Sequence, residues 1–221
     1  MSTTETTDSC LFTQLLVFTD CTDIKPLVLL LDRMSLTYVV YKNLNDPQGI
    51  GLLTIADHPE LLVTELRDVL CSRAFRVLMQ RHDLTMTGRG GDDAAARIDE
   101  LETVVNNEQW PWALWYPMRC TPAFAHLNEK EQGSVLDELA SGIDLSEEDF
   151  GHILLKSHAL NRGGGELIHG VHARSPQHLS RVVEAITSTE RFDEHIAGAG
   201  PFFVGRTLRG DGPLGGPTAR W

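Results

Sequence analysis

The sequence of 221 residues lacks the features that would place it at a membrane or on nucleic acid. Its longest apolar run, Pro26–Leu31, is far too short to span a bilayer. The first residues, Met1–Asp8, have no basic segment followed by an apolar one, so we expect no secretion signal there. The chain has only 19 basic residues against 31 acidic ones. The resulting net charge of −12 disfavours binding to nucleic-acid phosphates and to anionic lipids. We expect a cytoplasmic protein with no nucleic-acid partner and no membrane partner.

Cysteine is scarce, and the common catalytic signatures are missing. The four cysteines are scattered and form no CxxC pair, which indicates buried free thiols in a reducing compartment. There is no Ser/His/Asp elbow, P-loop, dinucleotide-binding fingerprint or Cys/His metal box. Gly163–Gly165 fits a hairpin turn and does not open a helix. What the chain has in excess is histidine: nine in all, six of them after residue 150.

Hydrophobic periodicity predicts one order of elements in the N-terminal part of the chain. Short apolar runs rich in branched and aromatic residues indicate strands, and i, i+3, i+4 spacing indicates helices. The predicted elements are a strand at Leu11–Phe18, a helix at Asp23–Met34, strands at Thr37–Tyr41 and Gly49–Ala56, a helix after His58-Pro59, and a strand at Phe75–Met86. The order is β-α-β-β-α-β.

The same order recurs in the C-terminal part, after a predicted helix at Ala94–Val105. The predicted elements are a strand at Trp112–Cys120, a helix capped by Asn128 and Glu131, strands at Gly151–His158 and Glu166–Ala173, a helix opened by Ser175-Pro176, and a strand at Pro201–Leu208. Two such units imply an α+β protein whose two antiparallel sheets pack together as a barrel. We divide the chain into a disordered start (1–9), an N-terminal half (10–87), a connector (88–109), a C-terminal half with the pocket (110–208) and a Gly/Pro-rich tail (209–221).

Three segments of the C-terminal half carry a family resemblance. They are Trp115-Tyr116-Pro117-Met118-Arg119, Ser157-His158-Ala159-Leu160-Asn161 and Gly200-Pro201-Phe202-Phe203-Val204-Gly205-Arg206. In this order and at these separations they resemble the chlorite dismutase and coproheme decarboxylase superfamily. The resemblance implies tandem ferredoxin-like repeats that form a dimeric α+β barrel. It also implies a homo-oligomer, commonly a pentamer, and a b-type heme or coproheme in the C-terminal half.

The sequence departs from that family where the heme would bind. The family's heme-ligating histidine maps to Leu139, which has no donor atom and cannot ligate iron. A distal arginine or glutamine of the family maps, within a residue or so, to His152, and a second arginine is replaced by Cys120. We therefore expect the fold to be kept and ordinary heme binding to be disfavoured.

The late histidines suggest another use for that cavity. Alternation along the strand places His152 and Lys156 on one face, which we assign to the barrel interior because Ile153 and Leu155 suit a helix-covered face. A hairpin turn centred near Arg162 would set His152 opposite His172, about 4.5–5.5 Å apart at Cβ. Such a pair could bind Cu, Fe or Zn, or act as a general base near neutral pH. Histidines on strands are, however, more often only hydrogen-bonded or solvated.

Three other residues are candidates for substrate binding. Arg119 could hold a carboxylate in a bidentate pair, although a surface ion pair is equally expected there. Tyr116 lies on the same strand, which by the resemblance edges the family's pocket, and Lys156 shares the predicted face of His152.

Three functions remain open from the sequence. The leading hypothesis is a small-molecule enzyme, an oxidoreductase, that uses His152 and His172 with a non-heme metal or with no cofactor. The second is a heme- or coproheme-binding protein with a displaced histidine ligand. The third is a non-catalytic ligand-binding barrel.

Overall fold

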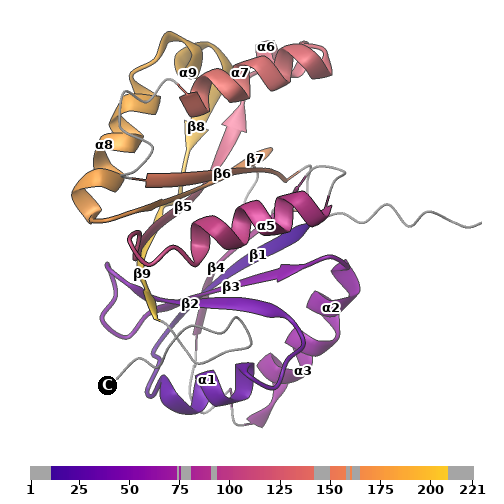
Figure 1. The fold of residues 1–221 in the computed structure, drawn as a ribbon, viewed down its shortest axis with the longest axis vertical. Coiled ribbons are helices and arrows are strands. Elements are labelled where there is room, and N and C mark those ends of the chain that lie inside the picture. Colours follow the sequence, from indigo (N-terminus) through magenta and orange to yellow (C-terminus); the bar gives the residue numbers. More distant parts are fainter. Residues whose placement is uncertain are drawn as a thin grey trace, which may run out of the picture.

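The computed structural model in Figure 1 describes residues 11–73, 75, 81–90, 94–141, 150–157, 160 and 165–208. The expected disordered start (1–9) and Gly/Pro-rich tail (209–221) lie outside these residues, as do His158 and Arg162. Among the described helices, none has both the length and the apolarity needed to cross a membrane.

The N-terminal half has the predicted β-α-β-β-α-β order, with its second helix broken at Thr64. Its elements are β1 (Phe12–Thr19), α1 (Lys25–Leu31), β2 (Thr37–Asn43), β3 (Ile50–Ala56), α2 (Pro59–Val63), α3 (Glu65–Cys71) and β4 (Arg81–Arg89). The strand predicted to begin at Phe75 begins at Arg81 instead. Phe75 is helical, and its ring packs edge-on against Phe18 with centroids 5.4 Å apart. A short apolar run does not by itself distinguish a helix from a strand, which explains the error.

The C-terminal half repeats the order and adds a short strand. Its elements are β5 (Trp112–Cys120), α6 (Pro122–Ala125), α7 (Glu129–Ser141), β6 (Phe150–Lys156), β7 (Leu167–Ala173), α8 (Pro176–Thr187), α9 (Glu190–His195), β8 (Ile196–Ala199) and β9 (Phe203–Leu208), while α5 (Ala94–Val105) connects the halves. The predicted capping box before α7 is present. The amide of Asn128 donates to a Glu131 carboxylate oxygen at 2.9 Å, and the amide of Glu131 donates to Oδ1 of Asn128 at 3.0 Å.

The strands close into a ring. Its order is β1-β3-β2-β9-β5-β7-β6-β4 and back to β1, with every pair antiparallel. The short strand β8 pairs with the C-terminal part of β5, beyond the part that pairs with β9. Figure 1 shows helices α1–α3 at one end of the molecule and α6–α9 at the other, with the strands between them. The predicted α+β barrel of two ferredoxin-like halves is confirmed.

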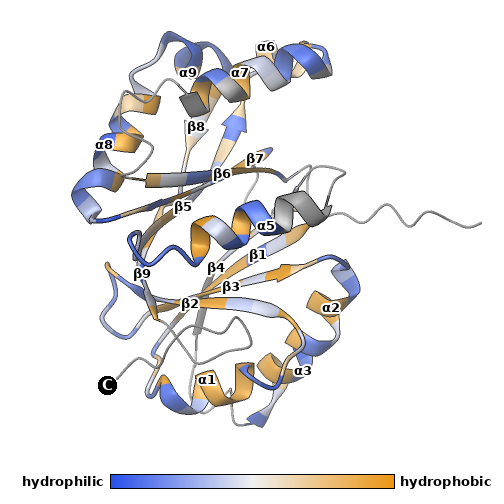
Figure 2. Ribbon diagram, in the orientation of Figure 1, coloured by the Kyte–Doolittle hydropathy of each residue, from blue (hydrophilic) through white to orange (hydrophobic). Residues whose placement is uncertain are grey.

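Three apolar clusters hold the fold together. One fills the space inside the ring and includes residues from both halves and from α5, such as Leu15, Tyr41, Leu101 and Trp115. The other two lie on the outer faces of the sheets, beneath the helices of each half. Figure 2 shows the apolar colouring along the strands and on one side of helices such as α8. Strands buried on both faces are apolar throughout, so their sequence does not show which face is which.

The hairpin of β6 and β7 differs from its predicted register by one residue. Gly151 lies opposite His172, and His152 lies opposite Val171. A Cβ on Gly151 would come within 2.4 Å of the Trp110 ring, and one on Gly170 within 2.5 Å of the Trp115 ring. The two glycines thus make room for two indoles inside the ring, and this packing fixes the register. The prediction that His152 faces His172 was wrong, because a slip of one residue moves a side chain to the other face.

Candidate functional site

The candidate site is a small cavity between the outer face of the C-terminal sheet and its helices. His152 lies on β6 and His169 on β7, on the same face of the hairpin as Leu154, while α7 and α8 cover them. The cavity has a volume of about 10 Å³, and its lining residues are Met118, Leu136, Leu139, His152, Leu154, His169 and Ile186. The predicted inward orientation of His152 is therefore wrong. Ile153 and Leu155 face the inside of the ring, and His152 faces the helices.

His169 is buried and held by Tyr116. The Tyr116 hydroxyl lies 2.8 Å from Nδ1 of His169, and the two rings meet edge to face with centroids 5.3 Å apart. Burial lowers the pKa of His169 to about 3, assisted by the neighbouring His152, so this imidazole is neutral at pH 7. Burial also raises the pKa of Tyr116, so its hydroxyl keeps its proton. The hydroxyl can donate to Nδ1, in which case the His169 proton is on Nε2, or accept from Nδ1–H in the other tautomer.

His152 is the second imidazole of the cavity. Its ring lies edge to face with that of His169, with centroids 5.7 Å apart and planes at 80°. Nδ1 of His152 is buried and has no hydrogen-bond partner within the described part of the chain. Burial lowers the pKa of His152, and the carboxylate of Glu100 on α5 opposes that shift. A buried ring nitrogen without a partner is rare in proteins and marks a candidate position for a ligand.

His172 lies on the opposite face of β7 from His169, inside the ring of strands. It is fully buried, with Nε2 3.4 Å from the Tyr41 hydroxyl and its ring 6.0 Å from that of Trp115. Burial lowers its pKa to about 3, against an opposing hydrogen bond with the Trp110 backbone. His152 and His172 therefore do not form the predicted pair, because they project to opposite sides of the same hairpin.

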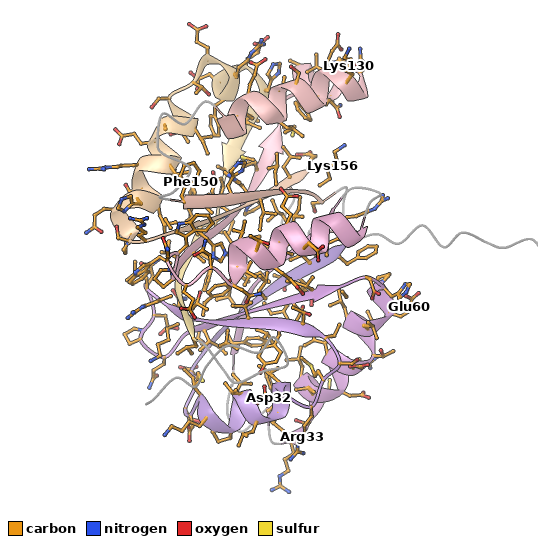
Figure 3. All side chains as sticks on the ribbon, viewed as in Figure 1. Asp32, Arg33, Glu60, Lys130, Phe150 and Lys156 are labelled. Atoms are coloured by element: carbon orange, nitrogen blue, oxygen red, sulfur yellow. The ribbon has the colours of Figure 1, made fainter. Side chains whose placement is uncertain are left out.

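The structure brings one of the three predicted substrate-binding residues to this cavity. Tyr116 reaches it through His169. Arg119 is exposed at the end of β5, where its guanidinium lies against Gly198 of β8. Lys156 lies at the opposite end of β6 from Phe150, as Figure 3 shows, four residues beyond His152 and therefore about 13 Å along the strand.

The residues of the cavity do not fit a heme bound in the manner that the resemblance implies. Leu139, which stands at the expected ligand position, is buried and lines the cavity without a donor atom. The cavity has room for about one water molecule, whereas sites for larger ligands span roughly 300–1,000 Å³. For a non-heme metal the cavity offers two neutral imidazoles. No cluster of three or more His, Cys, Asp or Glu side chains suited to a metal occurs within the described ranges.

The geometry defines a class of protein: a closed α+β barrel of two ferredoxin-like halves with a histidine-lined cavity under the helices of the second half. No family model and no curated protein sequence matches the chain. Solved structures do. A heme-binding protein from Thermus thermophilus matches with a TM-score of 0.71 at 14% identity, over 91% of this chain and 92% of that one.

Chlorite dismutase from Candidatus Nitrospira defluvii matches to the same extent. An arginine-to-alanine variant gives a TM-score of 0.71 at 14% identity over 91% and 92% of the two chains. Its complex with imidazole gives 0.69 at 14% identity over 90% and 91%. The chain therefore has the chlorite dismutase-like fold, as the three sequence segments indicated.

His169 is the residue that the sequence reasoning missed. It is one of the six late histidines, but only the correct hairpin register brings it to the face of His152. The pair of glycines was the available signal. Gly151 and Gly170 leave space for large rings on one face of the hairpin, and that face is consequently the interior one.

Proposed function

We propose that the protein is a small-molecule enzyme of oxidoreductase type that works in this cavity with a non-heme transition metal or without a cofactor. The observation that carries the proposal is the pair His152 and His169, set in an apolar cavity with Tyr116 behind it. His152 keeps the role proposed from the sequence. His169 takes the one proposed for His172, because His172 faces the interior of the ring.

The three side chains divide the chemistry among them. His152 is partly exposed and has a buried Nδ1 free to accept or donate a proton to a bound molecule. When the Tyr116 hydroxyl donates to Nδ1 of His169, the Nε2–H of His169 can donate a hydrogen bond to a bound molecule. The surrounding apolar side chains, among them Met118 and Ile186, lower the local polarity and so strengthen the hydrogen bond between Tyr116 and His169. In its other tautomer, with the proton on Nδ1 and the Tyr116 hydroxyl as acceptor, Nε2 of His169 would be free to ligate a metal beside His152, and a transition-metal ion held there would supply Lewis-acid or redox chemistry.

The fold relatives support the oxidoreductase assignment by analogy, since chlorite dismutases share this architecture. The test is metal analysis and an absorbance spectrum of the purified full-length protein, with a screen for dioxygen- or peroxide-dependent oxidation of small reporter molecules. We expect His152→Ala and His169→Ala to abolish metal binding or oxidation, and His178→Ala on α8 to leave both unchanged. A protein that binds no metal and keeps its activity after His152→Ala would contradict the proposal.

Heme binding is the second candidate, favoured by the location of the cavity in the C-terminal half and by the heme-binding Thermus protein of the same fold. It requires α7 to move away from the sheet and His152 or His169 to act as ligand. Hemin titration distinguishes this function, because a Soret band lost on replacing one of the two histidines would support it. Leu139→His, which places an imidazole at the family's ligand position, should then strengthen binding. A cavity that binds a ligand without turnover would instead indicate the third hypothesis, a binding barrel.

We further propose, from the likeness in fold, that the chain forms a homo-oligomer, with a pentamer as the expected form. Light scattering on the purified protein gives the mass directly. A monomer at micromolar concentration would contradict this assembly.

A further inference from the structure

Each of the two imidazoles in the cavity has one ring nitrogen that the protein leaves unused. Nδ1 of His152 is buried and has no hydrogen-bond partner within the described part of the chain. Nδ1 of His169 contacts the Tyr116 hydroxyl at 2.8 Å, so Nε2 on the other side of that ring is left over, and no described residue bonds to it. Buried polar atoms without a partner are rare in proteins. We therefore expect a hydrogen-bonding occupant in the cavity that both rings line.

The size and the lining of the cavity select this occupant. Its volume of about 10 Å³ is close to the least that holds one water molecule. A larger molecule would have to displace Leu136 or Leu139, which line the cavity from α7. None of the lining residues carries a permanent charge, so an anion would lose its hydration shell without gaining a countercharge. The space accepts one neutral molecule of the size of water.

The spacing of the two rings suits one bridging molecule. The ring centroids of His152 and His169 lie 5.7 Å apart with their planes at 80°, and no direct hydrogen bond joins these two described rings. Two hydrogen bonds of ordinary length through one oxygen join atoms roughly 4.5–6 Å apart. Water can donate or accept at each end, so it satisfies every combination of tautomers of the two rings. An empty cavity would leave both nitrogens without a partner, which is costly for buried groups.

A water at this position would connect a buried imidazole to a more accessible one. His169 is only 3% exposed, whereas His152 on the neighbouring strand is partly exposed. An imidazole can take up a proton at one ring nitrogen and release another from its second nitrogen. A chain of His152, water and His169 therefore gives protons a path into a site that apolar side chains otherwise close.

We propose that one water molecule is a fixed part of this site, bridging Nδ1 of His152 and Nε2 of His169, and that it relays protons between the two rings. When His152 is protonated, its Nδ1–H passes a proton to the water while the water passes one of its own to Nε2 of His169. This step uses the tautomer of His169 with its proton on Nδ1. The positive charge moves from one ring to the other, and the water stays neutral. Only the use of this relay in catalysis rests on the proposed function.

Two measurements on the full-length protein test the water and the relay. A crystal structure at a resolution that shows ordered solvent should contain one water within about 2.7–3.2 Å of both ring nitrogens. Histidine-selective ¹⁵N NMR after transfer to D₂O measures the exchange rate of the His169 ring proton. We expect this proton to exchange about tenfold faster, or more, than that of His172, which is equally buried but lies inside the ring of strands. A cavity without a water in the crystal structure would overturn the inference.

One substitution tests the relay directly. His152→Phe keeps a planar ring but removes the nitrogen that bonds to the water, so it should slow the exchange of His169 toward the rate of His172. A merely loosened structure would speed this exchange, so a slower rate is specific to the loss of the relay. His58→Phe, at an exposed position in the N-terminal half, is the matched control and should leave the rate unchanged.

An exchange rate that His152→Phe leaves unchanged or raises would overturn the relay. If His152→Phe does not fold, the crystal structure and the comparison of His169 with His172 in the unaltered protein still decide the question.

The outcomes separate this inference from the proposed function. A bridging water and fast exchange of His169, in a protein that binds no metal and oxidises nothing, would support the inference and contradict the enzyme. A dry cavity in a protein whose oxidation activity depends on His152 would do the reverse. A metal ion found between the two rings in place of the water would support the proposed function and overturn the inference.

Discussion

The Tyr116 hydroxyl and Nδ1 of His169 lie 2.8 Å apart, both buried, and join β5 to β7 on the helix-covered face of the sheet. The contact lies directly behind the ring that faces His152. It makes Tyr116 a residue that positions His169, and this differs from the substrate-binding role proposed from the sequence.

Replacing Tyr116 by Phe should therefore act mainly on His169, by removing the hydroxyl that contacts its Nδ1. The change leaves Nδ1 of His169 buried without a donor, at a cost of about 1–3 kcal/mol in the free energy of unfolding. Urea denaturation measures that cost, and ¹⁵N NMR of the His169 ring should show a shift in tautomer. Tyr41→Phe is the matched control, since its hydroxyl lies 3.4 Å from His172 and should cost less. An unchanged His169 spectrum would show that the hydrogen bond does not set the tautomer.

Alanine substitution of His172 should mainly lower stability, whereas alanine substitution of His152 should mainly remove ligand binding or activity. His172 is fully buried among aromatic rings, so His172→Ala should lower the free energy of unfolding by about 2–5 kcal/mol, as for other large buried side chains. His152 is partly exposed, so His152→Ala should cost less than about 1 kcal/mol while removing ligand binding or activity. Thermal and urea unfolding beside the metal-binding assay compare the two. A greater loss of stability in His152→Ala would reverse the assignment.

Stability should fall as the pH drops from neutral. His169 and His172 have pKa values lowered to about 3 in the folded protein, against an ordinary value of 6.5. Between these values the unfolded chain binds more protons, so the free energy of unfolding rises with pH and is lost progressively below pH 6.5. Well below that pH each histidine contributes about 1.4 kcal/mol per pH unit, and the two together about 2.7.

Urea denaturation between pH 5 and 6.5 measures this slope. That pH range lies about 1–2 units above the ordinary carboxyl pKa, so most carboxylates do not titrate within it. His172→Gln should reduce the slope by about 1.4 kcal/mol per pH unit, since one buried imidazole is gone, while His169 and His152, whose pKa burial also lowers, still contribute. Gln177→Ala, a neutral change on α8, should leave it unchanged. A slope that His172→Gln does not alter would show that His172 is not held neutral by the fold.

Two glycine substitutions should have opposite signs. Gly170→Ala forces a Cβ to within 2.5 Å of the Trp115 ring and should destabilise the fold by about 1–3 kcal/mol. Gly133→Ala lies in α7 with no atom within 4 Å of the new Cβ, and should stabilise the fold by about 0.4–1 kcal/mol. Melting temperatures of the two variants give the comparison. A neutral Gly170→Ala would show that Trp115 can move, and that the glycines do not fix the hairpin register.

Much of the fold could be predicted because it depends on local patterns. The strand Trp112–Cys120 was predicted at its observed bounds. The capping box at Asn128 and the Ser175 cap marked two helix starts, because their hydrogen bonds join residues three apart. The order of elements then limited the topology to a barrel of two similar halves.

The candidate site was only half predictable. His152 was identified from the sequence, but its partner depended on a hairpin register that differs by a single residue from the expected one. Because β7 is buried on both faces, and the helix-facing side of β6 carries His152 and Lys156 beside Leu154, hydrophobicity could not show which face meets the helices. That choice depends on Trp110 and Trp115, whose indoles reach Gly151 and Gly170 from other parts of the chain.

By itself the sequence determined the repeated α+β architecture, the acidic character and the leucine at the position where the family resemblance expects a heme ligand. These follow from residue type and local spacing. Only the tertiary structure decided that His169 joins His152 in the cavity and that His172 lies inside the ring. The physical reason is that strand register is set by contacts between distant side chains, and each one-residue step turns a side chain to the opposite face.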